Sequence, residues 1–449
     1  MQQHANTITE GTIWKQLLFF SVPLLIGNLF QQLYNTVDSI IVGNYVGRNA
    51  LAAVGSSTVI INMIIGFFMG IAAGAGVLIS HFYGAKDKQA VHDVVHTSML
   101  AMIYSGIILT AAGILLTPVI IRLMGTPQEV QSSSILYLRV FFLGIIALMI
   151  YNMGAGLLRA VGDSKRPLYY LIAASVCNII LDFVFVLFFK LGVFGVALGT
   201  VFSEILSAAL VVTALMRSND CYRLIPRDLH IHEKHLFSII KIGLPAGIQQ
   251  SVISFSNVIV QSKINMFGAA AMAGYSACTK IDSFVTLPFM SLSLASTTFI
   301  GQNIGAKKWD RVKTSARTSF VFSAIITALL SVLIVIFGRR LLAFFTSDTD
   351  VIQYGQIMLN CMAPFYILCA FSNVCSGIIR GAGETRVPML IMVGNYCVLR
   401  IIWVSIITAL IHNIVAVFSG YLFTWTTAAV MMALYYKKGN WLSRYHSDR

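Results

Sequence analysis

Residues 152–167 read NMGAGLLRAVGDSKRP, and residues 373–388 read NVCSGIIRGAGETRVP. Five residues of the first stretch recur unchanged in the second, each 221 positions later: Asn152, Gly156, Arg159, Gly162 and Pro167. The same offset carries Gly84-Ala85-Lys86 onto Gly305-Ala306-Lys307. One constant offset over so much of the chain indicates a tandem duplication.

Both copies are strongly apolar. Hydrophobic residues make up 57% of the chain and charged residues 11%, and the mean hydropathy is +0.81, which excludes a soluble domain. A helix needs about 20 apolar residues to cross about 30 Å of hydrocarbon. Twelve such runs predict an all-α, polytopic membrane protein: 18–44, 52–80, 94–121, 135–158, 167–189, 193–216, 238–266, 273–300, 315–338, 354–379, 388–411 and 413–436.

Each copy therefore holds six spans, and six is even, so both copies enter the membrane in the same direction. This predicts two six-helix bundles related by a pseudo-two-fold axis along the membrane normal. The polar stretch between the copies is the predicted domain boundary. We expect an N-lobe at 1–216, a cytoplasmic linker at 217–237 and a C-lobe at 238–449.

The net charge of +14 is distributed unevenly among the connections. Twenty Lys and Arg residues fall on the side of the N-terminus, and five fall on the opposite side. Because cytoplasmic loops carry the excess of positive charge, both termini are predicted to be cytoplasmic, in the cell inner (cytoplasmic) membrane. The same rule explains the excess of basic residues, so no nucleic-acid partner is expected.

No metal site or catalytic motif is evident. The seven cysteines form no CxxC pair, and we interpret His92 and His96, four residues apart, as a solvated helix end because no third ligand accompanies them. A phosphate-binding loop, a nucleophile elbow and HExxH are all missing, so we expect neither an enzyme nor ATP-driven transport by this chain alone.

The repeated turns have local explanations. Gly84 is expected to supply the positive φ that ends the second helix, with Lys86 in cytoplasmic water. Gly162 is expected to serve the turn that follows Arg159, and Pro167 to begin the next helix.

Asp38 is a lone carboxylate inside the first apolar run, 18–44. A carboxylate at membrane depth costs about 2.5–3.5 kcal/mol on insertion scales, so it indicates function by default. Gln31 and Tyr34 share its helix face by spacing. In the same half, Asn178 and Asp182 are four residues apart in the fifth run.

Two further polar residues belong to the same half, Thr200 in the sixth run and Asn152 in the fourth. Oxygen ligands of this kind suit Na⁺, or a proton shared between carboxylates. The alternative is a polar network that only holds helices together, at about 0.6–2 kcal/mol per hydrogen bond.

Pro23 lies fifteen residues before Asp38 and predicts a kink, either static or a moving hinge. Pro245 occupies a similar place in the seventh run. Four other ionisable residues within spans need partners, and both structural ion pairing and transport remain open for them: Glu204, Lys280, Asp282 and Arg400.

The chain resembles the multidrug and toxic compound extrusion (MATE) family over nearly its whole length. The resemblance rests on the twelve spans in two halves, on both repeated turns and on residues 34–43, YNTVDSIIVG. It implies that Asp38 carries the coupling cation and that Asn178, Asp182 and Thr200 complete the site. Gln31, Tyr34 and Asn152 would then form the surrounding polar network, and Pro23 the helix kink. Ile253 replaces a Glu that some members carry, so a second site in the C-lobe is not expected.

What the resemblance implies is a cation-coupled antiporter, driven by H⁺ or Na⁺ without another cofactor, that exports bulky amphipathic, often cationic drugs and toxic compounds by alternating access. Its partners would be those small molecules and membrane lipid, and we expect a monomer. A flippase for a lipid-linked cell-wall or polysaccharide precursor is the alternative transporter, and a membrane-embedded enzyme is the third possibility. The sequence decides neither the substrate nor the cation.

Overall fold

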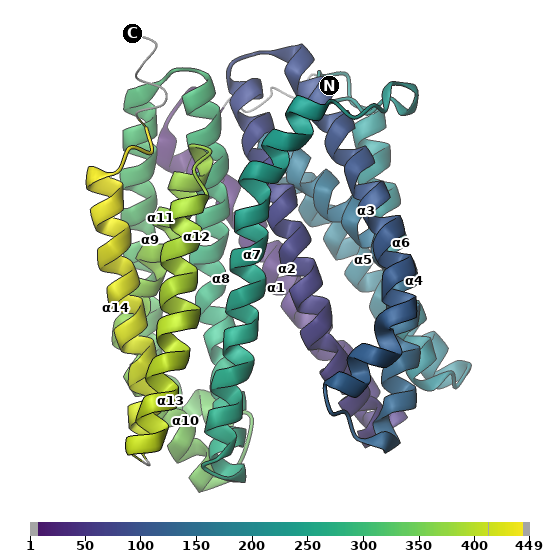
Figure 1. Ribbon diagram of the computed structural model, residues 1–449, viewed down its shortest axis with the longest axis vertical. Coiled ribbons are helices and arrows are strands. Elements are labelled where there is room, and N and C mark those ends of the chain that lie inside the picture. The colour runs from purple at the N-terminus through teal and green to yellow at the C-terminus, as the bar shows by residue number, and fades with distance from the viewer. Residues whose placement is uncertain (1–7, 412, 443–449) are drawn as a thin grey trace. The chain divides into compact units, whose positions relative to one another are not determined.

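The computed structural model describes residues 8–411 and 413–442, and the secondary structure in these residues is helical, with turns and loops between the helices (Figure 1). The first half contains α1 Ile13–Ile41, η1 Val42–Val46, α2 Arg48–Gly84, α3 Lys88–Leu123, α4 Gln128–Ala160, α5 Lys165–Phe183, η2 Val184–Phe188, α6 Gly192–Met216 and η3 Pro226–Asp228. The second half contains α7 Glu233–Asn265, α8 Ala269–Gly305, α9 Trp309–Ala343, α10 Thr349–Met362, η4 Ala363–Phe365, α11 Tyr366–Gly381, α12 Arg386–Val393, η5 Gly394–Leu399, α13 Arg400–Leu410 and α14 Ile414–Lys438.

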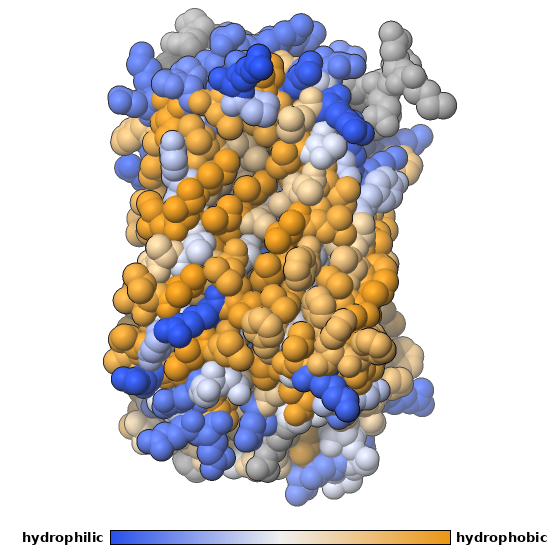
Figure 2. All heavy atoms as spheres, turned by 90° about the vertical axis from the view of Figure 1, so that its right-hand side faces the viewer, coloured by the Kyte–Doolittle hydropathy of each residue, from blue (hydrophilic) through white to orange (hydrophobic). Residues whose placement is uncertain are grey.

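Twelve candidate membrane spans occur among the described residues, as predicted. Two of them each combine two α-helices, because α10 and α11 form one span and α12 and α13 another. The face in Figure 2 carries hydrophobic side chains over a broad central band and hydrophilic ones toward both ends. The all-α, multi-pass membrane fold is therefore confirmed.

Several helices extend beyond their predicted apolar runs. The run 94–121 is part of α3, which already begins at Lys88. The Asp87 side chain accepts a hydrogen bond from the Ala90 N–H at 3.1 Å and so caps this polar first turn. Hydrophobicity marks where a helix crosses lipid, whereas capping decides where it begins.

The described chain separates into two compact units, residues 22–247 and residues 8–21 with 248–442. Two helices are therefore divided. The division in α1 falls next to Pro23, and the division in α7 falls two residues after Pro245. Each helix begins in one unit and ends in the other.

In the first unit, α4 is the central helix and packs against α2, α3 and α6. Small residues allow the close contact between α4 and α6. A Cβ on Gly144 would lie 2.8 Å from Val201, and one on Gly154 would lie 2.8 Å from Val211. Helices in lipid associate by packing, so such glycines fix how α6 presents its polar residues.

The linker before α7 is anchored on α3, within the first unit. His96 is fully buried, and its Nε2 accepts a hydrogen bond from the Ile225 N–H at 3.0 Å. Thr97 Oγ1 donates to the His230 carbonyl and accepts from the His232 N–H. The interpretation of His96 as part of a solvated helix end is therefore wrong, because the linker covers it.

The segment before α1 is anchored in the second unit, where α8 packs against α9, α10 and α11. The Arg311 guanidinium donates to the carbonyls of Ile8 at 3.0 Å and Gly11 at 2.7 Å, and Lys308 Nζ donates to the Thr9 carbonyl at 2.9 Å. Each segment that precedes a divided helix is therefore fastened to the unit in which that helix begins.

The repeated turns agree with the sequence at one position and differ at another. Gly162 has a φ of 100°, as its turn requires. The prediction for Gly84 is wrong, since the left-handed residue is Lys86, with a φ of 61°. Gly84 is the last residue of α2, and the Asp87 N–H donates to the Phe82 carbonyl at 2.9 Å, which places the left-handed residue two positions later than predicted.

Candidate functional site

Three predicted site residues, Gln31, Tyr34 and Asp38, lie on the part of α1 that belongs to the first unit. Their spacing of three and four residues places them on one helix face. The Gln31 amide and the Tyr34 hydroxyl are within hydrogen-bonding range of each other. Shortly after Asp38 the helix widens into the π-segment η1. Such π-turns are often found at functional sites.

Asn178 joins three helices at this point. With its side-chain nitrogen toward α1, it donates to Asp38 Oδ1 at 2.9 Å, and its oxygen accepts from the Thr200 N–H of α6 at 3.3 Å. The hydrogen-bond network assigns this amide orientation. Asn178 is 1% exposed, so the predicted α5 and α6 residues meet Asp38 inside the unit.

Asp182, one turn after Asn178 on α5, is fully buried. Its carboxyl group is within hydrogen-bonding range of the Asp38 carboxyl group. Neither Asp182 oxygen accepts a hydrogen bond from any donor among the described residues. Two carboxylates this close in an apolar interior repel each other unless a proton or a cation lies between them.

Gly199 of α6 allows Asp182 to occupy this position. A Cβ on Gly199 would overlap with Asp182 Oδ1. Sequence reasoning missed this residue, because a glycine in an apolar helix carries no chemical signal of its own. Its position next to Thr200 is the only signal that could have pointed to it.

Thr200 and Asn152 use their donors within their own helices. Thr200 Oγ1 donates to the Val196 carbonyl at 3.1 Å, and Asn152 Nδ2 donates to the Leu148 carbonyl at 3.0 Å. Both side chains therefore keep oxygen lone pairs for a further partner. The Thr200 backbone is joined to the Asp38–Asn178 pair, whereas the Asn152 amide donates within α4 and forms no hydrogen bond to that pair in the described part of the chain.

Two more residues belong to this environment. Tyr137 of α4, which sequence reasoning missed, is 7% exposed and interacts electrostatically with Asp38, Asp182 and Glu204. Glu204 lies one turn after Thr200, and its Oε2 is buried without a hydrogen-bond partner among the described residues. A Cβ on Gly144 would lie 3.2 Å from that oxygen, so Glu204 rests against the α4 backbone.

The charges of this group are all negative. Among residues 8–411 and 413–442, Asp38, Asp182 and Glu204 form no ion pair with Lys or Arg. Carboxylate, amide and hydroxyl oxygens are ligands for hard cations, and a carboxylate pair can also hold one proton. No group of three or more His, Cys, Asp or Glu side chains suited to a metal ion occurs in the described part of the chain.

The second unit contains a different arrangement. Arg400 is 3% exposed, and its guanidinium lies 4.5 Å from the Tyr421 ring and 5.2 Å from the Tyr396 ring. It also donates to Asn257 Oδ1 at 3.3 Å. Asp282 faces the Tyr366 hydroxyl and forms no ion pair with Arg400 or Lys280 within the described residues. Aromatic rings thus provide the partner that Arg400 needed.

Comparison with known proteins decides the family. The MatE family profile matches residues 23–184 and 245–406, one match in each copy of the repeat. The chain belongs to the MATE family. As a member of this transporter family it is not an enzyme, and the resemblance seen in the sequence is confirmed.

Relatives match over almost the whole chain. The probable multidrug resistance protein YoeA of Bacillus subtilis (strain 168) is 30% identical over 93% of this chain and 95% of its own length. YpnP of the same strain, also a probable multidrug resistance protein, is 30% identical over 97% and 98%. The multidrug export protein MepA of Staphylococcus saprophyticus is 23% identical over 92% and 94%.

Solved structures share the MATE fold. A MOP superfamily transporter from Pyrococcus furiosus Vc1 (DSM3638) superposes with a TM-score of 0.92 at 23% identity, covering 100% of this chain and 99% of that one. An outward-facing multidrug resistance MATE transporter gives a TM-score of 0.90 at 23% identity over the same shares. These likenesses concern the fold alone.

Proposed function

We propose that this chain is a cation-coupled antiporter that exports bulky amphipathic, often cationic compounds by alternating access. The coupling ion is H⁺ or Na⁺, and its site is formed by Asp38, Asn178, Asp182 and Thr200. The proposal is supported by the family, by relatives described as multidrug resistance proteins, and above all by the proximity of the partly buried Asp38 carboxyl group to the buried Asp182 carboxyl group.

The carboxyl pair provides a physical basis for coupling. Without a cation the two negative charges repel each other in a medium of low dielectric, and no Lys or Arg among the described residues forms an ion pair with them. A bound proton or Na⁺ removes this repulsion and allows α1 and α5 to pack closely. Cation binding therefore changes which packing of α1 is stable, and a substrate that favours the other packing competes with the cation.

Pro23 gives α1 a place to bend. It lies where α1 passes from one compact unit to the other, and it removes one helical hydrogen bond. A change in the packing of residues 24–41 can therefore alter the angle of α1 at this proline. We propose Pro23 as a hinge, residues 1–216 and 238–449 as the two lobes, and the connection 217–237 as their linker, in a monomer with both termini cytoplasmic.

The energy available is sufficient. One positive charge that moves inward across 100 mV of membrane potential releases about 2.3 kcal/mol. This corresponds to roughly fifty-fold accumulation of a neutral substrate.

Dye efflux from vesicles tests this function. The purified chain is reconstituted, a cationic amphipathic dye is supplied, and a pH gradient and a Na⁺ gradient are imposed separately. Uphill dye movement with one gradient, and its loss when that gradient is collapsed, is the expected result. Dye movement that never exceeds equilibration under either gradient, together with transfer of a lipid-linked sugar across the bilayer, would favour the flippase and overturn the proposal.

A further inference from the structure

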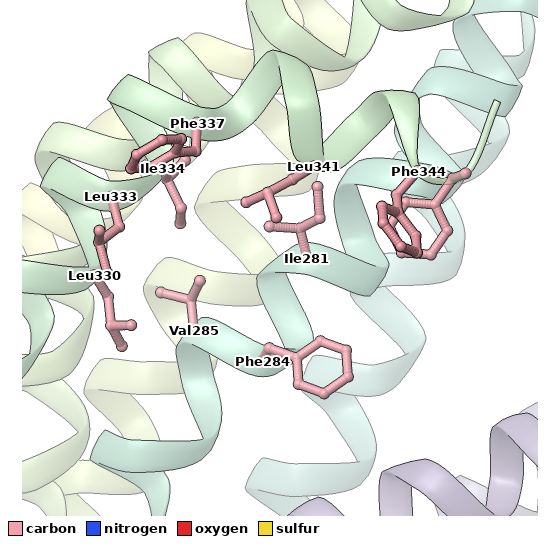
Figure 3. Close-up of a pocket in the computed structure, with 10 residues that line it drawn as sticks. Ile281, Phe284, Val285, Leu330, Leu333, Ile334, Phe337, Leu341 and Phe344 are labelled. Atoms are coloured by element: carbon pink, nitrogen blue, oxygen red, sulfur yellow. The ribbon is translucent and has the colours of Figure 1, made fainter. Parts of the chain in front are cut away.

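A pocket lies between α8 and α9 in the second unit, with a volume of about 560 Å³ (Figure 3). All of its lining side chains are apolar, and four of them are phenylalanines, Phe284, Phe337, Phe344 and Phe345. The volume is in the range of pockets that enclose drug-sized ligands.

Apolarity alone does not identify a binding site here, because every lipid-facing surface of a membrane protein is apolar. Two further properties distinguish this surface. It is hollow, with α9 residues from Leu330 to Leu341 facing Ile281 and Val285 of α8 across it (Figure 3). In addition, two basic side chains lie at the end of the pocket near Phe344 and Phe345, which follow directly after α9.

Both cations pack on the aromatic wall of the pocket. The Lys280 ammonium lies 5.4 Å from the centre of the Phe345 ring, and the Arg340 guanidinium lies 5.9 Å from that of Phe337. Both side chains are exposed, and neither forms an ion pair with a carboxylate in the part of the chain that the structure describes. Arg340 lies three residues before α9 ends at Ala343, which places the charges near the membrane surface.

The repeat provides an internal comparison. At the positions 221 residues earlier, Lys280 corresponds to Val59 and Arg340 corresponds to Val119. Ile334 of the pocket corresponds to Gly113, whose place is filled by the Phe142 ring of α4. The first half therefore has neither cation at these positions, so the cations are not a necessary consequence of the duplicated fold.

We propose that this pocket, defined as the α8–α9 lipid site, binds one anionic phospholipid. Lys280 and Arg340 contact the headgroup phosphate, and an acyl chain occupies the apolar pocket below them. The charge complementarity selects an anionic headgroup over a zwitterionic one. Two basic side chains near a membrane surface contribute about 1 kcal/mol each, which corresponds to a preference of roughly thirty-fold.

Native mass spectrometry of the delipidated full-length protein tests this site. Phosphatidylglycerol and phosphatidylcholine with identical oleoyl chains are titrated separately, and the first binding constant is compared. Wild-type protein should prefer phosphatidylglycerol by roughly thirty-fold. The double variant Lys280→Gln/Arg340→Gln should lose most of this preference and still bind both lipids weakly through the acyl chain.

Two matched variants make the result specific. Arg317→Gln removes an exposed cation elsewhere on α9 and should leave the preference intact. Leu333→Trp, at a half-exposed pocket position, fills the pocket and should weaken both lipids equally.

Equal binding of the two lipids by the wild type overturns the proposal. A preference that survives in the double variant also overturns it, because the phosphate then binds elsewhere. Binding of an anionic amphipathic drug at this pocket in place of either lipid would assign the site to a substrate and would equally refute it. None of these outcomes depends on transport activity.

Discussion

Gly199 of α6 lies directly against the Asp182 carboxyl group of α5, so close that a Cβ on this glycine would overlap with Asp182 Oδ1. Asp182 in turn is within hydrogen-bonding range of Asp38. A residue without a side chain therefore determines whether two carboxyl groups on different helices can meet. This relationship links helix packing to the proposed coupling chemistry.

Gly199→Ala is expected to reduce coupled efflux strongly while the protein still inserts. The added methyl displaces Asp182 from Asp38, and overpacking of this kind costs about 1–3 kcal/mol, so gradient-driven efflux should fall by about fivefold or more. Dye efflux from vesicles with equal amounts of protein measures the effect. Gly55→Ala on α2 is the control, because a Cβ there meets nothing within 4 Å. Equal efflux by the two variants would contradict the prediction.

Asp38→Asn and Asp182→Asn should each insert and fold but lose uphill efflux. An amide removes one negative charge, so the repulsion that a cation must relieve disappears. Downhill equilibration of dye should remain, which distinguishes lost coupling from lost folding. Asp282→Asn, in the second unit, should reduce uphill efflux much less. A wild-type accumulation ratio in Asp38→Asn would show that the cation is not carried there.

Much of the fold could be predicted from the sequence, because lipid imposes a simple rule on it. Every span must be apolar and helical, so twelve runs and one 221-residue offset were enough to predict twelve spans in two halves. The proximity of Asp38 to Asn178 and Asp182 could also be predicted from the sequence. Polar side chains on apolar helices are costly to expose to lipid, so they tend to face one another inside the helix bundle.

Features that depend on packing between helices could not be predicted. Tyr137 joins the site through the position of α4, which no spacing along the chain reveals. His96 has the sequence environment of a helix end in water, yet the linker residue Ile225, 129 positions later, covers it. Lys86 in place of Gly84 adopts the left-handed conformation because the helix ends two residues later than the glycine suggests.

His96→Leu is expected to destabilise the first unit without a direct effect on the carboxyl pair. The substitution leaves the Ile225 N–H without its acceptor, and an unsatisfied buried donor costs about 1–3 kcal/mol. Thermal unfolding in detergent should show a lower midpoint than the wild type. His230→Ala, which removes an exposed ring, should leave the midpoint unchanged. A midpoint in His96→Leu equal to that of the wild type would mean that the linker contact contributes no stability.

Pro23→Ala tests whether the kink in α1 is a hinge or a fixed bend. Alanine restores the backbone N–H that proline lacks, so the helix can complete its hydrogen bonds and resist bending at the point where it passes between the two units. If bending accompanies each transport cycle, turnover should slow roughly tenfold, equivalent to about 1.4 kcal/mol on the rate-limiting barrier, while dye affinity stays the same. Stopped-flow dye efflux and equilibrium dye binding measure the two quantities.

Pro118→Ala provides the control, because Pro118 also lies inside a helix, α3, that is contained within one unit. Should both variants turn over at the wild-type rate, the proline would be a static feature of α1, and the cation would have to act on transport through another element.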